Sequence, residues 1–77
     1  MGGAKLDWDR LKVFQTVADS GSINAAAKVL GRSYGKVSKD LEELERALGH
    51  QLFERSNRGL ELTTVGEDIL RTARSMA

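Results

Sequence analysis

Residues 21–55 read GSINAAAKVLGRSYGKVSKDLEELERALGHQLFER, and this stretch decides the fold. It holds two helical segments around a short polar break. Ser22 and Ser33 stand at N-cap positions, and Gly31 and Gly49 follow the last apolar residue of each segment. Serine caps the free N–H groups of a helix start, and glycine takes the left-handed conformation that ends a helix. Two helices joined by so short a turn indicate a helix-turn-helix, whose second helix lies in the major groove of DNA.

The second segment, residues 33–48, has the pattern of a recognition helix with two different sides. At about 100° per residue, one side collects Tyr34, Val37, Leu41, Leu44 and Leu48. The other side collects Arg32, Gly35, Lys36, Lys39, Glu43 and Arg46, with the basic residues mostly in the N-terminal half. We therefore expect the apolar side in the core and the basic side at the phosphates.

Charge is distributed unevenly along this helix. From Arg32 to Lys39 three residues are basic and none is acidic, whereas residues 40–49 hold four acidic residues against Arg46 alone. The net charge of the whole chain is only +1. DNA contact is therefore expected to be local to the first turns of the helix. The acidic half is expected to be a solvated face, with Glu42 and Arg46 as an i,i+4 ion pair.

The segment before the pair predicts one more helix, from Trp8 to Asp19. Asp7 is its expected N-cap, and Leu6 can pack on Leu11 as a hydrophobic staple. The apolar stripe of this helix consists of Leu11, Phe14, Val17 and Ala18. That stripe is expected to face the core.

The segment after Gly49 predicts a hairpin and a last helix. The runs 52–55 and 60–63 flank the turn-forming residues 56–59. Two strands alone are marginally stable in water, so the hairpin must be anchored by Leu52, Phe53, Leu60 and Leu62. Either Thr63 or Thr64 can cap the last helix, and residues 64–67 (TVGE) match a capping box.

The expected fold is therefore mainly α: a winged helix-turn-helix with a three-helix core, a two-stranded β-hairpin as the wing and a C-terminal linker helix. Residues 1–5 are expected to form a flexible tail, residues 6–63 the DNA-binding domain and residues 64–77 a linker and dimerisation helix. The last helix has apolar residues and no evident partner in so small a core, which predicts pairing with a second copy. The expected dimer residues are Val65, Ile69, Leu70, Ala73 and Met76.

The expected DNA-contacting residues come from the start of the recognition helix and from the hairpin. They are Arg32, Ser33, Tyr34, Gly35, Lys36, Ser38, Lys39, Asp40, Arg55, Arg58 and Thr63. Lysines in this place can donate to guanine O6 and N7 or to phosphates. The two hairpin arginines bracket the turn, where a wing reaches a minor groove. Ser33 can cap its helix, contact DNA, or do both.

From about Leu6 to the C-terminus, the chain resembles the N-terminal DNA-binding domain of LysR-type transcriptional regulators. The resemblance rests on the apolar stripe of the first helix, Gly21-Ser22, Ala26-Ala27, Leu30, Ser33, Ser38, Leu41, Leu44-Glu45, Leu48-Gly49, residues 52–55, Leu62-Thr63 and Gly66. It implies a third helix in the major groove, Arg55 at the minor groove and homodimers or tetramers paired through the last helix. It also implies a C-terminal effector domain, which this chain lacks. The chain is therefore either a DNA-binding fragment or a naturally minimal relative, and a fragment is expected.

One departure from the family pattern bears on specificity. The family commonly opens the recognition helix with Ser-Gln-Pro or Ser-Gln-Ser, whereas this chain has Ser33-Tyr34-Gly35. A glutamine that could bind adenine is replaced by a tyrosine, whose helical angle turns it toward the core. Sequence preference therefore cannot be taken from relatives. The Ser-Tyr pair also resembles the DNA-binding domain of molybdate-responsive ModE-type regulators, which remains the close alternative.

Composition argues against several other classes of protein. The 77 residues include no cysteine and one histidine, His50, and they contain no glycine-rich phosphate loop. Neither an enzyme, a cofactor, a metal site nor a small-molecule site is expected. No apolar stretch approaches the about 20 residues of a membrane span, and a cytoplasmic location is expected. A winged helix used only for protein contact remains an alternative, against which the acid-free basic stretch from Arg32 to Lys39 argues.

Overall fold

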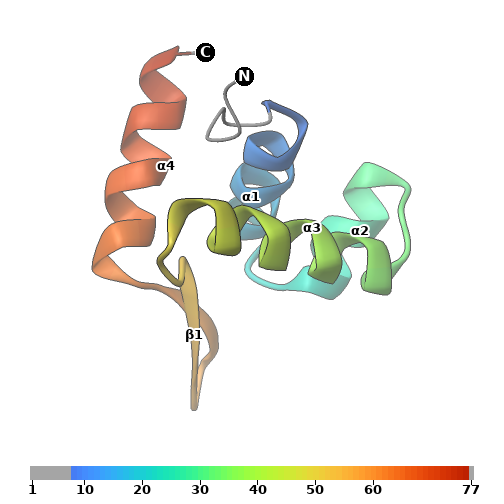
Figure 1. Cartoon of the computed structure of the whole chain (residues 1–77). Helices are drawn as coiled ribbons and strands as arrows, with labels where there is room; N and C mark the ends of the chain where they lie inside the picture. The colour runs from blue at the N-terminus through green and yellow to red at the C-terminus, as the bar shows by residue number, and fades with distance from the viewer. Residues whose placement is uncertain (1–7, 77) are drawn as a thin grey trace.

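Residues 8–76 form four helices and one two-stranded antiparallel sheet (Figure 1). The computed structural model describes residues 8–76, and at Met76 the backbone alone. The elements in chain order are α1 (Trp8–Ser20), α2 (Ile23–Leu30), α3 (Tyr34–Leu48), β1 (Phe53–Ser56), β2 (Gly59–Leu62) and α4 (Thr64–Met76). The expected winged helix-turn-helix architecture is thereby confirmed. The predicted tail, the Asp7 cap and the Leu6 staple lie outside the described residues.

The residues that begin and end α2 and α3 are those expected from the sequence. The Ser22 hydroxyl accepts a hydrogen bond from the Ala25 N–H at 3.0 Å, and the Ser33 hydroxyl accepts one from the Lys36 N–H at 3.1 Å. Gly31 and Gly49 end the two helices with φ values of 68° and 75°. A side chain would be strained in that left-handed region. Local chemistry thus sets where the recognition helix starts and ends.

The core lies where α1, α2 and α3 meet, and Leu52 and two residues of α4 complete it. Its buried apolar residues are Leu11, Val13, Phe14, Val17, Ala26, Ala27, Val37, Leu41, Leu44, Leu52, Leu70 and Ala73. Tyr34 is a correction, because it was expected on the core side and is 46% exposed. It is the first residue of α3, and the helix is covered by its neighbours only from Val37 onward. Tyr34 therefore belongs to the outer surface.

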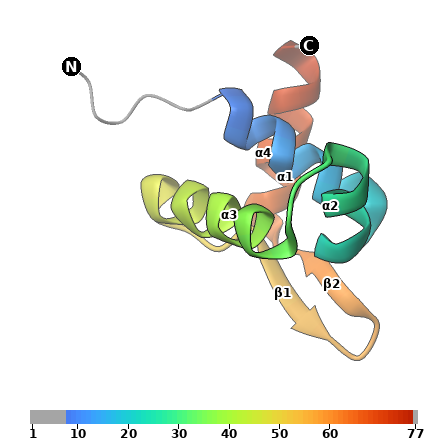
Figure 2. The ribbon, with the colours of Figure 1, turned by 90° about the vertical axis from the view of Figure 1, so that its right-hand side faces the viewer.

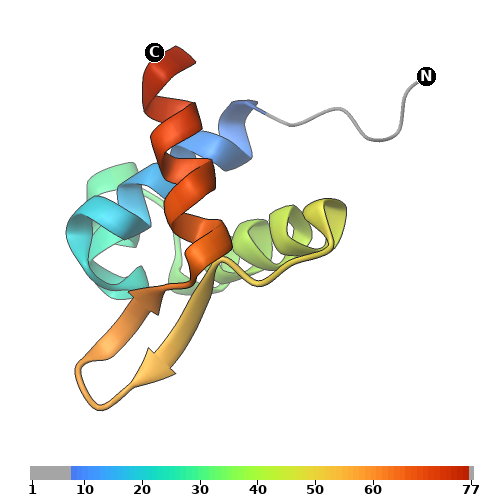
Figure 3. The ribbon, with the colours of Figure 1, turned by 90° about the vertical axis from the view of Figure 1, so that its left-hand side faces the viewer.

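The wing, residues 53–62, projects away from the helices (Figures 2 and 3). Its register pairs Phe53 with Leu62 and Ser56 with Gly59, so the strands start and end within one residue of the predicted runs. The four predicted anchors are confirmed: Leu52 is fully buried, and Phe53, Leu60 and Leu62 pack against the core. The ring of Phe53 lies 5.4 Å from that of Phe14 between centroids. The wing is thus fixed to α1 at its base.

Helix α4 is capped by Thr63 and packs on α1. The Thr63 hydroxyl accepts a hydrogen bond from the Gly66 N–H at 2.9 Å, so the capping box starting at Thr64 is wrong. Arg74 of α4 forms an ion pair with Asp19 of α1 at 2.5 Å. Gly66 is buried beside the loop before the wing, where an added Cβ would lie 2.2 Å from the Leu52 carbonyl oxygen. The first turn of α4 therefore touches the backbone at the base of the wing.

We predict that Gly66→Ala lowers the free energy of unfolding by about 1–3 kcal/mol, because the new methyl group meets backbone rather than a movable side chain. Gly35→Ala is the matched control: Gly35 is also helical, and an added Cβ there has no neighbour within 4 Å. It should raise stability by up to about 1 kcal/mol. Urea denaturation measures both. Equal effects of the two changes would contradict the close approach at Gly66.

Candidate nucleic-acid interface

Three separate parts of the chain meet around one hollow of about 360 Å³. The start of α2 contributes Ser22, Ile23 and Asn24, and α3 contributes Tyr34. The wing contributes Arg55, Ser56 and Arg58 among its lining residues. A helix-turn-helix thus presents the start of its second helix beside the wing. Beside the apolar Ile23 and Leu60, the lining side chains include the aromatic Tyr34, the basic Arg55 and Arg58 and three polar residues, which suits contact with nucleic acid.

The outer side of α3 exposes most of the predicted contact residues. Ser33, Tyr34, Gly35, Lys36 and Lys39 are exposed, and Ser38 is half-buried. Of the two roles predicted for Ser33, capping is confirmed, because its hydroxyl accepts from the Lys36 N–H. Contact with DNA stays a prediction for these residues. We call the exposed set, together with Arg55 and Arg58, the recognition face.

Asp40, one of the predicted DNA contacts, is buried and paired with two cations. It is 3% exposed, and its carboxylate accepts from Lys36 Nζ at 3.1 Å and from Arg32 Nη1 at 3.3 Å. A buried carboxylate requires such partners, because removing its charge from water is costly. An i,i+4 pairing of Lys36 with Asp40 was readable in the sequence, but the burial of Asp40 was not.

Arg32, another predicted DNA contact, bridges two carboxylates. Its guanidinium also donates to both oxygens of Asp9, at 3.0 and 3.3 Å. The hydrogen bond from Arg32 lowers the pKa of Asp9, and the bond to Asp9 raises the pKa of Arg32. Asp9 lies 23 residues upstream, so no local pattern could reveal this contact. The stretch from Arg32 to Lys39 contains no acidic residue, but in the structure Arg32 contacts the carboxylates of Asp9 and Asp40.

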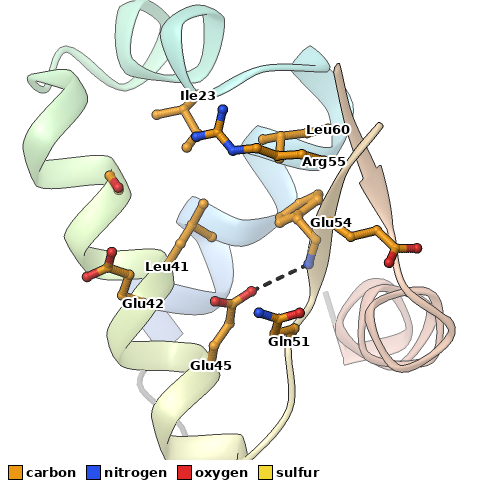
Figure 4. Close-up of a pocket in the computed structure, with 10 residues that line it drawn as sticks. Ile23, Leu41, Glu42, Glu45, Gln51, Glu54, Arg55 and Leu60 are labelled. Atoms are coloured by element: carbon orange, nitrogen blue, oxygen red, sulfur yellow. Dashed lines mark hydrogen bonds between the residues drawn. The ribbon is translucent and has the colours of Figure 1, made fainter. Parts of the chain in front are cut away.

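The wing arginines occupy different places. Arg55 faces the same side of the strand as Phe53, since strand residues alternate. Figure 4 shows its guanidinium extending from β1 toward Ile23 of α2, rather than toward the hairpin tip. Arg58 lies in the turn itself and is exposed. The Thr63 hydroxyl donates to the Gln51 carbonyl at 2.7 Å while it caps α4, and contact of Thr63 with DNA stays a prediction.

The acidic half of α3 is not the solvated face that was expected. Glu45 accepts a hydrogen bond from the Leu52 N–H at 2.8 Å and another from the Phe53 N–H at 3.4 Å, beside the groove between α3 and β1 (Figure 4). Glu43 pairs with Arg10 of α1 at 2.5 Å. Within residues 8–76, the expected pair of Glu42 with Arg46 is not among the ion pairs. These carboxylates hold α3 to α1 and to the wing.

The predicted dimer residues are mostly part of the domain's own packing. Leu70 is 9% exposed and Ala73 is fully buried, because α4 does have a partner in α1. Val65 and Ile69 are half-buried against the same core. The side chain of Met76 lies outside the described residues. The outer side of α4 instead has a groove lined by Leu62, Glu67, Leu70, Arg71, Arg74 and Ser75.

Residues 8–76 contain no group of three or more side chains placed to hold a metal ion. No helix in that range combines the length and the hydrophobicity that crossing a bilayer requires.

A sequence model described as "Bacterial regulatory helix-turn-helix protein, lysR family" matches residues 8–67. The chain belongs to this family. That match also decides between the two families that the sequence resembles, in favour of the LysR-type regulators. It covers α1 to the first turn of α4, and with them every element of the recognition face.

Proteins similar to this LysR-family chain are much longer. It is 48% identical to the transcriptional regulator YofA of Bacillus velezensis over 63 residues, which cover 82% of this chain and 22% of YofA. It is 39% identical to the regulator ClcR of Pseudomonas putida over 71 residues, covering 92% of this chain and 24% of ClcR. The chain thus spans about a quarter of the length of these regulators.

Solved structures with the same fold include complexes with DNA. The CbnR_DBD–DNA complex superposes with a TM-score of 0.86 at 41% identity, covering 92% of this chain and 82% of that one. The BenM_DBD/catB site 1 DNA complex superposes with a TM-score of 0.87 at 28% identity, covering 92% and 76%. This LysR-family chain therefore has the structure of the helix-turn-helix domain found in those complexes.

We predict that Glu45→Ala lowers the free energy of unfolding by about 1–3 kcal/mol, because it leaves two partly buried N–H groups without an acceptor. Amide exchange at Leu52 and Phe53 should accelerate together with this loss. Glu42→Ala, the same change at an exposed neighbouring position, should cost less than about 0.5 kcal/mol. Unchanged exchange at both amides in the Glu45 variant would contradict the role given to this carboxylate.

Proposed function

We propose that this chain binds double-stranded DNA sequence-specifically to regulate transcription, with α3 in a major groove and the wing at the neighbouring minor groove. One observation carries the proposal. The N-terminal half of α3 exposes Lys36 and Lys39, and its first residue, Tyr34, lines one hollow together with Arg55 and Arg58 of the wing. This is the arrangement through which a helix-turn-helix reads base edges while basic side chains hold phosphates.

Each residue of the recognition face has a proposed role. Lys36 and Lys39 donate to guanine or phosphate acceptors, and the Ser33 hydroxyl reaches a phosphate while it caps α3. Tyr34 presents an aromatic ring and a hydroxyl where the family commonly has glutamine, so it is the residue through which sequence preference departs from that of relatives. Arg55 lies between the wing and α2, and Arg58 reaches the minor groove. Asp40, Arg32 and Thr63 are not in this set.

The proposal extends to the protein as a whole. Relatives of about four times the length suggest a regulator that is not an enzyme, that works in the cytoplasm and that joins this domain to an effector domain. The effector, the operator and the sign of regulation are properties of that longer protein. Pairing of two copies through the outer groove of α4 would place two recognition faces on one partly palindromic site.

We predict that Lys36→Ala combined with Lys39→Ala weakens binding to a duplex selected from a random pool by roughly tenfold or more. The fold should survive, because Asp40 keeps Arg32 as its partner. The matched control is Lys12→Ala with Arg46→Ala, which removes the same charge from exposed positions outside the recognition face. Mobility shifts measure affinity, and circular dichroism measures folding. Absence of any shift for the unchanged protein at low salt would contradict the proposed function.

We predict that the chain dimerises at high concentration through the outer groove of α4. Arg71 lies at this groove and its side chain is 67% exposed, so Arg71→Glu should weaken the dimer by setting a new carboxylate beside Glu67. Arg46→Glu makes the same change on α3 and should leave the association unaffected. Sedimentation equilibrium measures the three dissociation constants. A monomer at every concentration would contradict the proposed pairing.

A further inference from the structure

Asp40 is the one buried ionisable side chain within residues 8–76, and the proposed DNA contacts do not use it. It lies on the recognition helix, one turn after Lys36. Each oxygen of its carboxylate accepts from a different cation: Oδ1 from Lys36 Nζ at 3.1 Å and Oδ2 from Arg32 Nη1 at 3.3 Å. A carboxylate with two cationic partners on the DNA-binding helix affects how much positive charge that helix offers to DNA.

The two cations are held to different degrees. Arg32 donates to Asp9 through both Nη atoms and to Asp40 through Nη1, so its rigid fork ties α1 to α3. Its side chain is 30% exposed. Among the described residues, the Lys36 ammonium pairs only with Asp40, and the side chain has a flexible stem and is 58% exposed. Arg32 is therefore a fixed partner of Asp40, and Lys36 is an exchangeable one.

Because Arg32 also pairs with Asp40, breaking the ion pair between Lys36 and Asp40 costs little free energy. If Lys36 were the sole partner, its movement to DNA would leave a buried charge without compensation. Because Arg32 stays, the Asp40 carboxylate keeps one cation. The Lys36 side chain is itself 58% exposed, so an acceptor on DNA can reach it and compete with Asp40 for it.

Lys39 differs from Lys36 although it lies on the same helix. It is exposed, and among the described residues it has no ion pair within 4.0 Å. A duplex of any sequence that approaches α3 loosely can contact Lys39. Contact with Lys36 requires an acceptor close enough to replace Asp40, which only a closely seated helix brings.

We propose that Asp40 is a specificity-determining residue. Its ion pair with Lys36 keeps that lysine from the phosphates of non-matching DNA, and the pair is exchanged for a DNA contact where α3 lies close in the groove. This rests on the proposed function and adds a regulation of the same site. The buried carboxylate lowers indiscriminate affinity, while Arg32 keeps the helix folded during the exchange. Discrimination between sequences then arises partly from a residue that does not touch DNA.

The test is the salt dependence of binding to a random-sequence duplex, measured by fluorescence anisotropy. The slope of log affinity against log salt concentration is negative; each phosphate contact contributes about 0.9 to its magnitude, and the slopes compared below are these magnitudes. We expect Lys39→Gln to lower the slope by about 0.9, and Lys36→Gln to lower it by less than half as much. Asp40→Asn should raise it by about 0.9 and raise low-salt affinity about fivefold. In a chain that already has Lys36→Gln, Asp40→Asn should leave the slope unchanged.

Glu43→Gln is the matched control, because it also removes a carboxylate from α3 but one that pairs with Arg10. Its slope should equal that of the unchanged protein. A folded Asp40→Asn variant with an unchanged slope, or one whose slope rises equally without Lys36, would overturn the inference. If Asp40→Asn fails to fold, equal losses from Lys36→Gln and Lys39→Gln would overturn it. An unchanged protein that binds no duplex would overturn the proposed function and this inference together.

Discussion

The two-sided helix α3 is the constraint on which the rest of the structure depends. Its inner side buries Val37, Leu41 and Leu44 in the core, and its outer side presents the recognition face. A helix can serve both purposes only if its rotation about its axis is held, since a small turn would bury the lysines and expose leucines. Several polar contacts hold that rotation in addition to the apolar packing.

These polar contacts come from all parts of the domain. Arg10 and Arg32 tie α3 to α1 through Glu43 and through the Asp9–Arg32–Asp40 bridge. Glu45 ties the other end of α3 to the wing by accepting from backbone N–H groups. Individually such contacts contribute little at a surface, but each is directional and fixes an orientation. The acidic half of α3 thus positions the basic half.

A few close contacts join α4 to the base of the wing. Gly66 lets the first turn of α4 approach the Leu52 carbonyl, and Thr63 both caps α4 and binds the Gln51 carbonyl. The base of the wing is therefore held from two sides, by Glu45 and by α4. Arg55 is placed between the wing and α2 as a consequence.

The sequence alone determined the helix boundaries, the hairpin and the outer lysines, because caps, left-handed glycines and helical periodicity act between residues close in the chain. Ser22, Ser33, Gly31 and Gly49 are examples. Only the tertiary structure decided the roles of Asp40, Arg32, Glu45, Tyr34 and Leu70. Their burial and partners depend on which segments meet. Asp9 accepts from Arg32, which lies 23 residues further along the chain, and α4 packs against α1. Such contacts follow from packing, which no local pattern encodes.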